Sequence, residues 1–229
     1  TPITVDVIVN PIPDVSGING SPICSGDLTD IILSTPNGVA GATYSWTVAE
    51  TGVTGATAGS GATIAQALTT TGSVAGTATY TITPSFSGCD GAPIDITVDV
   101  DPTPDVAATG ETICSGAATN IAITNPNGIG GTTFAWTISA NPGGITGGSA
   151  DNGTTIAQNL TNPGNTPQTL TYEITPTSGA CPGTPITVDV IVNPIPDVSG
   201  INGSPICSGD LTDIILSTPN GVAGATYSW

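Results

Sequence analysis

Cysteine is the residue type with the clearest chemistry in this sequence. Cys24, Cys114 and Cys207 each lie in an "ICSG" stretch, whereas Cys89 and Cys181 lie in the short stretches "SGC" and "GAC". The absence of histidine and of C-x-x-C spacing argues against zinc, and disulfides are favoured over buried free thiols. The spacing predicts the pairs Cys24–Cys89 and Cys114–Cys181, with the partner of Cys207 outside this chain. Such bonds indicate an oxidising, extracytoplasmic location.

Aspartate is the second candidate. Carboxylate oxygens are the ligands that Ca²⁺ prefers, and the chain has 17 acidic residues and no lysine, arginine or histidine. Some aspartates follow proline-rich stretches such as "NPIPD", and others share one face of an expected strand. The calcium candidates are Asp14, Asp95, Asp99, Asp101, Asp105 and Asp197. No dense D-x-D-x-D loop occurs, so solvated surface charge is the competing interpretation.

The same composition argues against enzymatic activity. Without histidine, lysine or arginine the chain lacks a usual general base near neutral pH, a Schiff-base amine and a cationic oxyanion clamp. Ser25 and Ser115, in the "CSG" stretches, have no base to activate them and are expected to be turn residues. A pair of carboxylates could in principle cleave a glycoside, but nothing in the sequence indicates a cleft. We predict that the protein is not an enzyme.

A net charge of −17 also limits the partners. Nucleic-acid affinity and attraction to anionic lipid both depend on lysine and arginine, so neither is expected. No apolar run reaches the roughly 18–20 residues that a membrane span needs, and direct membrane insertion is not expected. We expect no cofactor other than calcium.

The chain is repetitive, and the repeats must position these residues. Residues 184–229 are identical to residues 1–46, at an offset of 183. Within this period a weaker repeat aligns 23–48 with 113–138 and 62–69 with 154–161, which gives units of about 91 residues. We therefore expect four parts: 1–13 as the last strand of a preceding repeat, 14–104 and 105–196 as whole repeats, and 197–229 as the first half of another. The identity predicts a window of a longer periodic molecule.

Short strands with period-two alternation recur in each repeat. Apolar residues alternate over 31–33, 44–48, 78–82 and 94–100, and Gly, Pro and Asn mark the turns between them. About seven such strands in ~91 residues predict an immunoglobulin-like, all-β sandwich, with proline-stiffened junctions between repeats in a rod. The aromatic residues expected in the cores are Trp46, Tyr80, Trp136 and Tyr172.

Several stretches together carry a family resemblance: "ICSG", "TYSWTV", "TIAQ", "TYTITP" and "NPIPD". They resemble the PKD-like/Ig-like tandem repeats of very large Bacteroidota surface proteins, among them gliding-motility adhesins exported by type IX secretion. The resemblance covers the whole chain, and its motifs identify the class of repeat rather than an individual protein. It implies an extracellular, cell-surface setting in a long filament or stalk.

The leading functional hypothesis is therefore structural. The repeats would form part of an extracellular filament of an adhesin used in attachment or gliding, with neighbouring repeats of the same chain and lateral filament contacts as partners. One alternative is a glycan- or protein-binding module, which would require Trp46 or Trp136 to be exposed in a groove. Another is a surface polymer whose subunits exchange strands across their ends.

Overall fold

The computed structural model describes residues 3–201 and 203–229. Every helix or strand assigned in these residues is a β-strand, so the chain is all-β, and none of them forms a helix able to cross a membrane. The chain divides into two compact units. The first holds the described residues up to Pro104 together with two segments of the second repeat, Asn127–Thr132 and Thr177–Pro182; the second holds the remainder.

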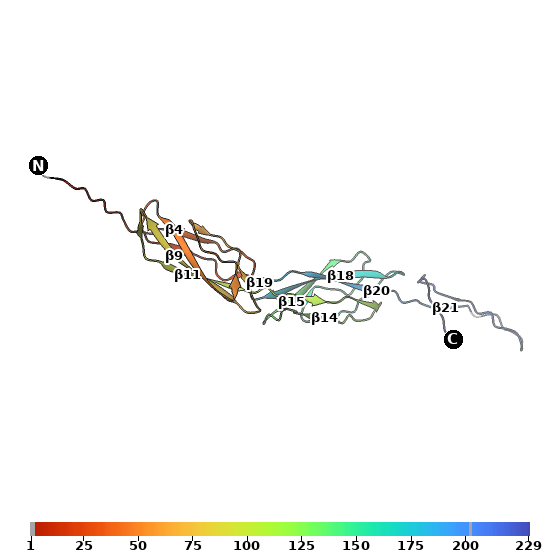
Figure 1. Ribbon diagram of the computed structural model, residues 1–229. Coiled ribbons are helices and arrows are strands. Elements are labelled where there is room, and N and C mark those ends of the chain that lie inside the picture. The colour runs from red at the N-terminus through yellow and green to blue at the C-terminus, as the bar shows by residue number, and fades with distance from the viewer. Residues whose placement is uncertain (1–2, 202) are drawn as a thin grey trace. The chain divides into compact units, whose positions relative to one another are not determined.

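The first repeat contributes two facing sheets to its unit. Three strands form one sheet in the order β1-β3-β7, six form a larger sheet in the order β2-β11-β9-β4-β6 with β10 paired to β9, and β5 pairs with β8. Figure 1 shows the long strands β4, β9 and β11 of the larger sheet side by side. The strands are β1 (Ser16–Ile18), β2 (Ile23–Cys24), β3 (Ile31–Ser34), β4 (Thr43–Thr51), β5 (Val53–Thr54), β6 (Gly59–Ser60), β7 (Thr63–Ile64), β8 (Thr69–Thr70), β9 (Gly76–Phe86), β10 (Cys89–Asp90) and β11 (Ile94–Asp101).

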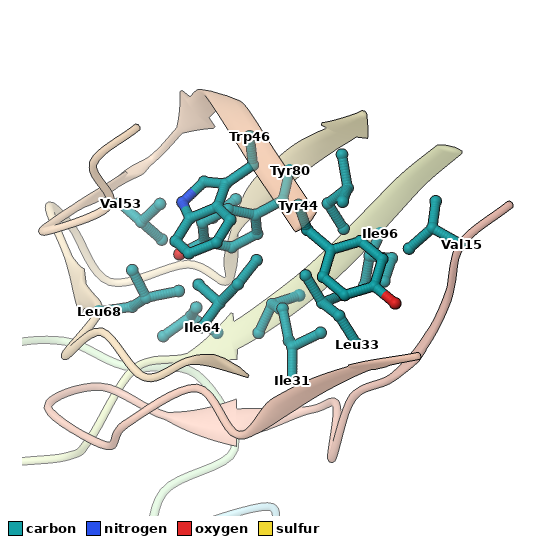
Figure 2. Close-up of a cluster of buried hydrophobic side chains, with 14 residues drawn as sticks. Val15, Ile31, Leu33, Tyr44, Trp46, Val53, Ile64, Leu68, Tyr80 and Ile96 are labelled. Atoms are coloured by element: carbon teal, nitrogen blue, oxygen red, sulfur yellow. The ribbon is translucent and has the colours of Figure 1, made fainter. Parts of the chain in front are cut away.

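The core of this sandwich follows from alternation along its strands. Successive side chains of a strand point to opposite faces, so every second residue is buried, as in β9, where Tyr80 and Ile82 have no exposed surface. Figure 2 shows Trp46 and Tyr80 from the larger sheet lying over Ile31 and Ile64 from the smaller one. The two aromatic side chains supply much of the apolar area that the fold removes from water.

The second repeat has the same architecture. Its sheets run β12-β14-β17 and β13-β20-β18-β15-β16, with β19 paired to β18. Its two predicted core aromatics are buried: Trp136 is 4% exposed and Tyr172 is fully enclosed. The strands are β12 (Ala107–Ala108), β13 (Glu111–Cys114), β14 (Ile121–Thr124), β15 (Thr133–Ala140), β16 (Asp151–Asn152), β17 (Thr155–Ile156), β18 (Gln168–Ser178), β19 (Cys181–Pro182) and β20 (Ile186–Asn193).

The stretches outside the two whole repeats leave most of their large apolar side chains exposed. Residues 3–13 form no strand, and Val7 is 79% exposed, whereas its equivalent Val190 is buried in β20 between β18 and β13. In 197–229 the short strands β21 (Ser199–Gly200) and β22 (Leu216–Ser217) pair with each other, and Trp229 is exposed. These residues have the sequence of part of a sandwich, but the strands that cover their equivalents in the whole repeats are not beside them.

Candidate functional site

Each repeat places one cysteine near each end of its larger sheet. In the first repeat, Cys24 lies in β2, which runs parallel to β11 and sets Cys24 opposite Asp101, the last residue of β11. Cys89 begins β10, which pairs with the far end of β9 through Phe86. Phe86 is ten positions along β9 from Gly76, which lies opposite Val100 near the end of β11. At ~3.3 Å per residue the two cysteines are therefore about 33 Å apart.

The disulfide in the structure joins Cys24 to Cys181, with a Cα–Cα distance of 5.5 Å. The predicted pairs Cys24–Cys89 and Cys114–Cys181 are therefore wrong. A disulfide needs Cα atoms within about 7 Å, and two cysteines at opposite ends of one sheet cannot meet. Cys181 lies in the segment Thr177–Pro182, which belongs to the first compact unit, and it is 2% exposed.

The three other cysteines carry free thiols in this chain. Cys89 is half-buried at the end of its hairpin, and Cys114 and Cys207 are exposed. Cys114 occupies in the second repeat the place that Cys24 occupies in the first, because β13 runs parallel to β20 and sets Cys114 opposite Asn193. The prediction that the partner of Cys207 lies outside this chain stays a prediction.

The two "CSG" serines hold turns, as the sequence indicates. The Oγ of Ser25 accepts a hydrogen bond from the backbone N–H of Thr70 at 3.0 Å, and the Oγ of Ser115 accepts one from the backbone N–H of Asn162 at 3.0 Å. Each hydroxyl thus ties the turn after its cysteine to a loop about 45 residues further along the chain. These contacts fix the position of the adjacent cysteine.

The strand-face aspartates are dispersed along the outer face of β11. Asp95 accepts a hydrogen bond from the hydroxyl of Thr81 at 2.6 Å. Asp99 is joined to Ser21, whose Oγ donates to its carboxylate at 3.4 Å and accepts from its backbone N–H at 2.9 Å. Asp101 lies at the end of the strand, opposite Cys24. Neighbouring hydroxyl groups therefore contact the first two carboxylates.

The aspartates that follow the proline-rich stretches begin each repeat. Asp14 accepts hydrogen bonds from the Thr35 hydroxyl at 3.0 Å and the Asn37 backbone N–H at 2.9 Å, and so holds the "TPNG" turn. Asp197 accepts from the backbone N–H of Asn220 at 2.9 Å in the same way. Asp105 is exposed at the start of the second repeat. In the described part of the chain, no group of three or more carboxylate or thiol side chains is placed to share a metal ion.

A buried polar network, which sequence reasoning missed, links the two sheets of the first repeat. The hydroxyl of Thr29 donates to the carbonyl oxygen of Ile64 at 2.9 Å and accepts from the backbone N–H of Gln66 at 2.9 Å. The side chain of Gln66 then accepts a hydrogen bond from the hydroxyl of Tyr80 at 2.9 Å. This satisfies the polar end of Tyr80, a fully buried side chain, without exposing it to water.

The second repeat reproduces this network. Thr119 donates to Ile156 at 2.8 Å and accepts from the backbone of Gln158 at 2.9 Å, and Tyr172 donates to the Gln158 side chain at 2.7 Å. A signal was present in the sequence, because "TIAQ" recurs at 63–66 and 155–158. A recurring glutamine beside a buried isoleucine indicates a polar group with a fixed internal partner.

A PKD-like domain model matches the chain twice, over residues 21–104 and 111–196. The chain belongs to the PKD-like domain family. It is a tandem of PKD-like β-sandwich repeats, and no curated protein matches it.

Solved structures with some likeness to these PKD-like repeats are multidomain fragments. An I-band fragment of titin is 9% identical with a TM-score of 0.39, and the match covers 90% of this chain and 76% of that fragment. Human CDH23 EC21-23 is 14% identical with a TM-score of 0.32, covering 92% and 78%. Drosophila N-cadherin EC1-3 is 9% identical with a TM-score of 0.29, covering 79% and 68%.

The buried tyrosines give the PKD-like repeats a dependence on alkaline pH. Burial raises the pKa of Tyr172 to about 12 from 10.0, and burial is also the main cause of the raised pKa of Tyr80. Between pH 10 and about pH 12, the Tyr172 hydroxyl loses its proton in the unfolded chain but keeps it in the folded chain. Rising pH therefore favours unfolding in this range, and below pH 10 the contribution is fully present.

We expect Tyr172→Phe to weaken the fall in stability between about pH 10 and pH 12, by up to ~2.7 kcal/mol at the top of the range. The variant also loses the hydrogen bond to Gln158, a cost that is nearly constant below pH 10 and can be subtracted. Urea unfolding at a series of pH values measures both effects. Equal slopes for the variant and the parent chain would contradict the assignment.

Calcium binding stays a prediction. Should the aspartates bind Ca²⁺ in the folded state only, EDTA is expected to lower the midpoint of thermal unfolding, because an ion present at one hundred times its Kd adds about 2.7 kcal/mol of stability. Restoring Ca²⁺ should restore the midpoint, and Mg²⁺ at the same ionic strength is the control. A midpoint that is unchanged by EDTA and by added Ca²⁺ would discard the idea.

Proposed function

We propose that these PKD-like repeats are the structural part of an extracellular filament or stalk, carried by a bacterial cell-surface adhesin that serves attachment or gliding motility. The observation that carries the proposal is the series of sandwiches of one design, with 46 residues recurring without change at an offset of 183. Each whole domain that is repeated in series adds to the length of the molecule, so the repetition favours a role that depends on length.

The internal use of the polar groups supports a structural role. The "CSG" serines hold turns, the hydroxyls of Tyr80 and Tyr172 are bonded to glutamine side chains, and Asp14 and Asp197 cap turns within their own repeats. The disulfide supports a location outside the cytoplasm, where such bonds persist. We also propose that the protein is not an enzyme, because its sequence has no histidine, lysine or arginine to serve as a general base or an oxyanion clamp.

The glycan- or protein-binding alternative receives no support from the core tryptophans. It required an aromatic ring exposed in a groove, and Trp46 and Trp136 are both buried.

The strand-exchanged polymer is favoured by one observation. Val5, Val7 and Val9 are exposed in residues 3–13, whereas the same residues are buried when they recur in β20. Such a strand is able to complete a sandwich in another copy.

The structural proposal is tested with chains that contain one, two and four copies of the 183-residue period, purified under oxidising conditions. The long strands β9 and β18 each have 11 residues, so a repeat of about 40 Å and a period of roughly 80 Å are expected. Electron microscopy should show particles whose length grows linearly with the number of periods. Compact particles, whose length grows more slowly than the number of periods, would contradict the proposal.

The same chains distinguish the strand-exchanged polymer. A continuous stalk keeps its length on dilution, whereas a polymer of exchanged subunits shortens as the protein concentration falls.

The surface location is tested with an antibody raised against residues 14–104. Labelling of intact cells and inhibition of attachment or gliding are expected, and labelling only after permeabilisation would contradict an extracellular role.

A further inference from the structure

We propose that a disulfide joins every pair of consecutive repeats, and that it always connects the "ICSG" cysteine of one repeat to the hairpin cysteine of the next. This inference rests on the proposed function, because it requires repeats in series. Cys24 and Cys181 form the bond that the structure contains. Cys114 would bond to the hairpin cysteine of the following repeat, and Cys89 to the "ICSG" cysteine of the preceding one.

The first half of the argument is that the "ICSG" cysteines occupy the same place in their repeats. Cys24 and Cys114 lie in edge strands that run parallel to the last strand of the repeat. In both repeats the next residue donates its backbone N–H to the final residue of that last strand, Ser25 to Asp101 and Ser115 to Asn193, each at 2.8 Å.

The turn that follows is the same as well. Gly26 donates to the carbonyl oxygen of Leu68, and Gly116 to that of Leu160, each at 2.7 Å. Both glycines have positive φ, 98° and 85°, a conformation that glycine adopts without strain. Cys114 is thus held in the conformation in which Cys24 forms its bond, and its thiol is exposed.

The second half is that the hairpin cysteines are equivalent. Cys89 pairs with Phe86 across the β9–β10 hairpin, and Cys181 pairs with Ser178 across β18–β19. A backbone hydrogen bond closes each hairpin two residues after the cysteine, from Gly91 to Pro84 at 2.8 Å and from Gly183 to Pro176 at 2.9 Å. Cys89 is therefore presented as Cys181 is.

The chain direction makes the pairing consistent along a series. The "ICSG" cysteine lies at the end of the sheet where the last strand leaves for the next repeat, at Asp101 or Asn193. The hairpin cysteine lies at the opposite end, just before the last strand begins at Ile94 or Ile186. In a series each junction therefore receives one cysteine from either side, and neither repeat offers an internal partner.

Bond formation is an ordinary thiol–disulfide exchange. The thiolate of one cysteine attacks a sulfur of an external disulfide, either a small-molecule disulfide or an oxidoreductase, and forms a mixed disulfide. The second thiolate then attacks the protein sulfur and displaces the other half of the reagent. Two protein thiols lose two protons and two electrons, and the reagent is reduced to two thiols.

The test uses a longer chain in which residues 47–196 follow Trp229, as residue 47 follows Trp46, so that the last repeat keeps its copy of β20. This chain gains copies of Cys89, Cys114 and Cys181. After oxidation in a glutathione buffer it is digested at aspartate without reduction, and linked peptides are identified by mass spectrometry. We expect three bonds: Cys24–Cys181, Cys114 to the copy of Cys89, and Cys207 to the copy of Cys181. Two thiols stay free for alkylation.

Pairing within repeats gives a different result, because it links Cys24-type to Cys89-type peptides and Cys114-type to Cys181-type peptides, and leaves no free thiol. That result, or an unbonded Cys114, would overturn the proposal. The same peptides linked between chains, seen as dimers on non-reducing gels, would also overturn it.

A matched variant removes one junction only. In the longer chain, Cys114→Ser should free the copy of Cys89, raise the number of free thiols from two to three, and leave the Cys24–Cys181 peptide pair intact. Release of a Cys181 thiol instead would contradict the proposal. Particle length is also measured on the unsubstituted longer chain. If that chain forms a rod but its Cys114 stays unbonded, this inference is refuted and the proposed function still stands.

Discussion

Replacing Cys24 by serine is expected to lower the free energy of unfolding of the first compact unit by about 2–5 kcal/mol. The bond to Cys181 spans a sequence separation of 157 residues. In the chain-entropy model a cross-link over so long a loop removes many conformations from the unfolded chain, which places the expected effect in the upper part of that range. Cys181 is also 2% exposed, so the variant leaves a buried thiol without its partner.

The measurement needs a signal that is specific to the first unit. Trp46 lies in that core, and in a background of Trp136→Phe and Trp229→Phe its fluorescence reports unfolding of that unit alone. Urea unfolding of the Cys24→Ser chain should show a lower midpoint with an unchanged or larger slope. Cys181→Ser should have a similar effect, and the double variant should cost little more than either single one, because both remove the same bond.

Cys207→Ser is the matched control, since this cysteine has the same "ICSG" context and an exposed free thiol. A surface change of this kind is expected to stay within about 0.5 kcal/mol. If Cys24→Ser proved equally neutral, or if Cys89→Ser destabilised the first unit as Cys24→Ser is expected to, the bond between Cys24 and Cys181 would not be the one that stabilises it.

The sequence predicts the sandwich well because burial of one strand face imposes a period of two. Ile96, Val98 and Val100 alternate with threonine and aspartate, and β11 buries that face. The same reasoning places Trp46 and Tyr80 on faces that the structure buries. Long strands carry enough residues for the alternation to be read without knowledge of their neighbours.

The disulfide could not be predicted in this way, because its position depends on an element without periodicity. Strand β2 consists of two residues, Ile23 and Cys24, and its parallel pairing with β11 decides which end of the sheet Cys24 occupies. The buried polar network could not be predicted from the sequence for a different reason. Thr29 and Gln66 are polar, and hydropathy alone assigns such residues to the surface, whereas their partners Ile64 and Tyr80 lie in the core.

Gly147→Ala should be the most destabilising small substitution in the second repeat, at about 3–5 kcal/mol. Gly147 has φ of +90°, and a Cβ atom at this position would collide with the backbone carbonyl oxygen of Asn159. The approach is close because Thr146 and Thr161 exchange backbone hydrogen bonds of 3.0 and 2.9 Å. Relief of the collision would break this bridge, which lies beside the fully buried Leu160.

The chain offers a control three residues away that separates backbone strain from collision. Gly144 also has positive φ, +66°, but a Cβ atom there meets nothing within 4 Å. Gly144→Ala should therefore cost only the conformational strain of alanine, about 1–2 kcal/mol. Urea unfolding followed by Trp136 fluorescence in a Trp46→Phe, Trp229→Phe background measures both. Equal costs would show that the backbone conformation alone requires glycine, whereas the expected excess at Gly147 assigns the difference to the contact with Asn159.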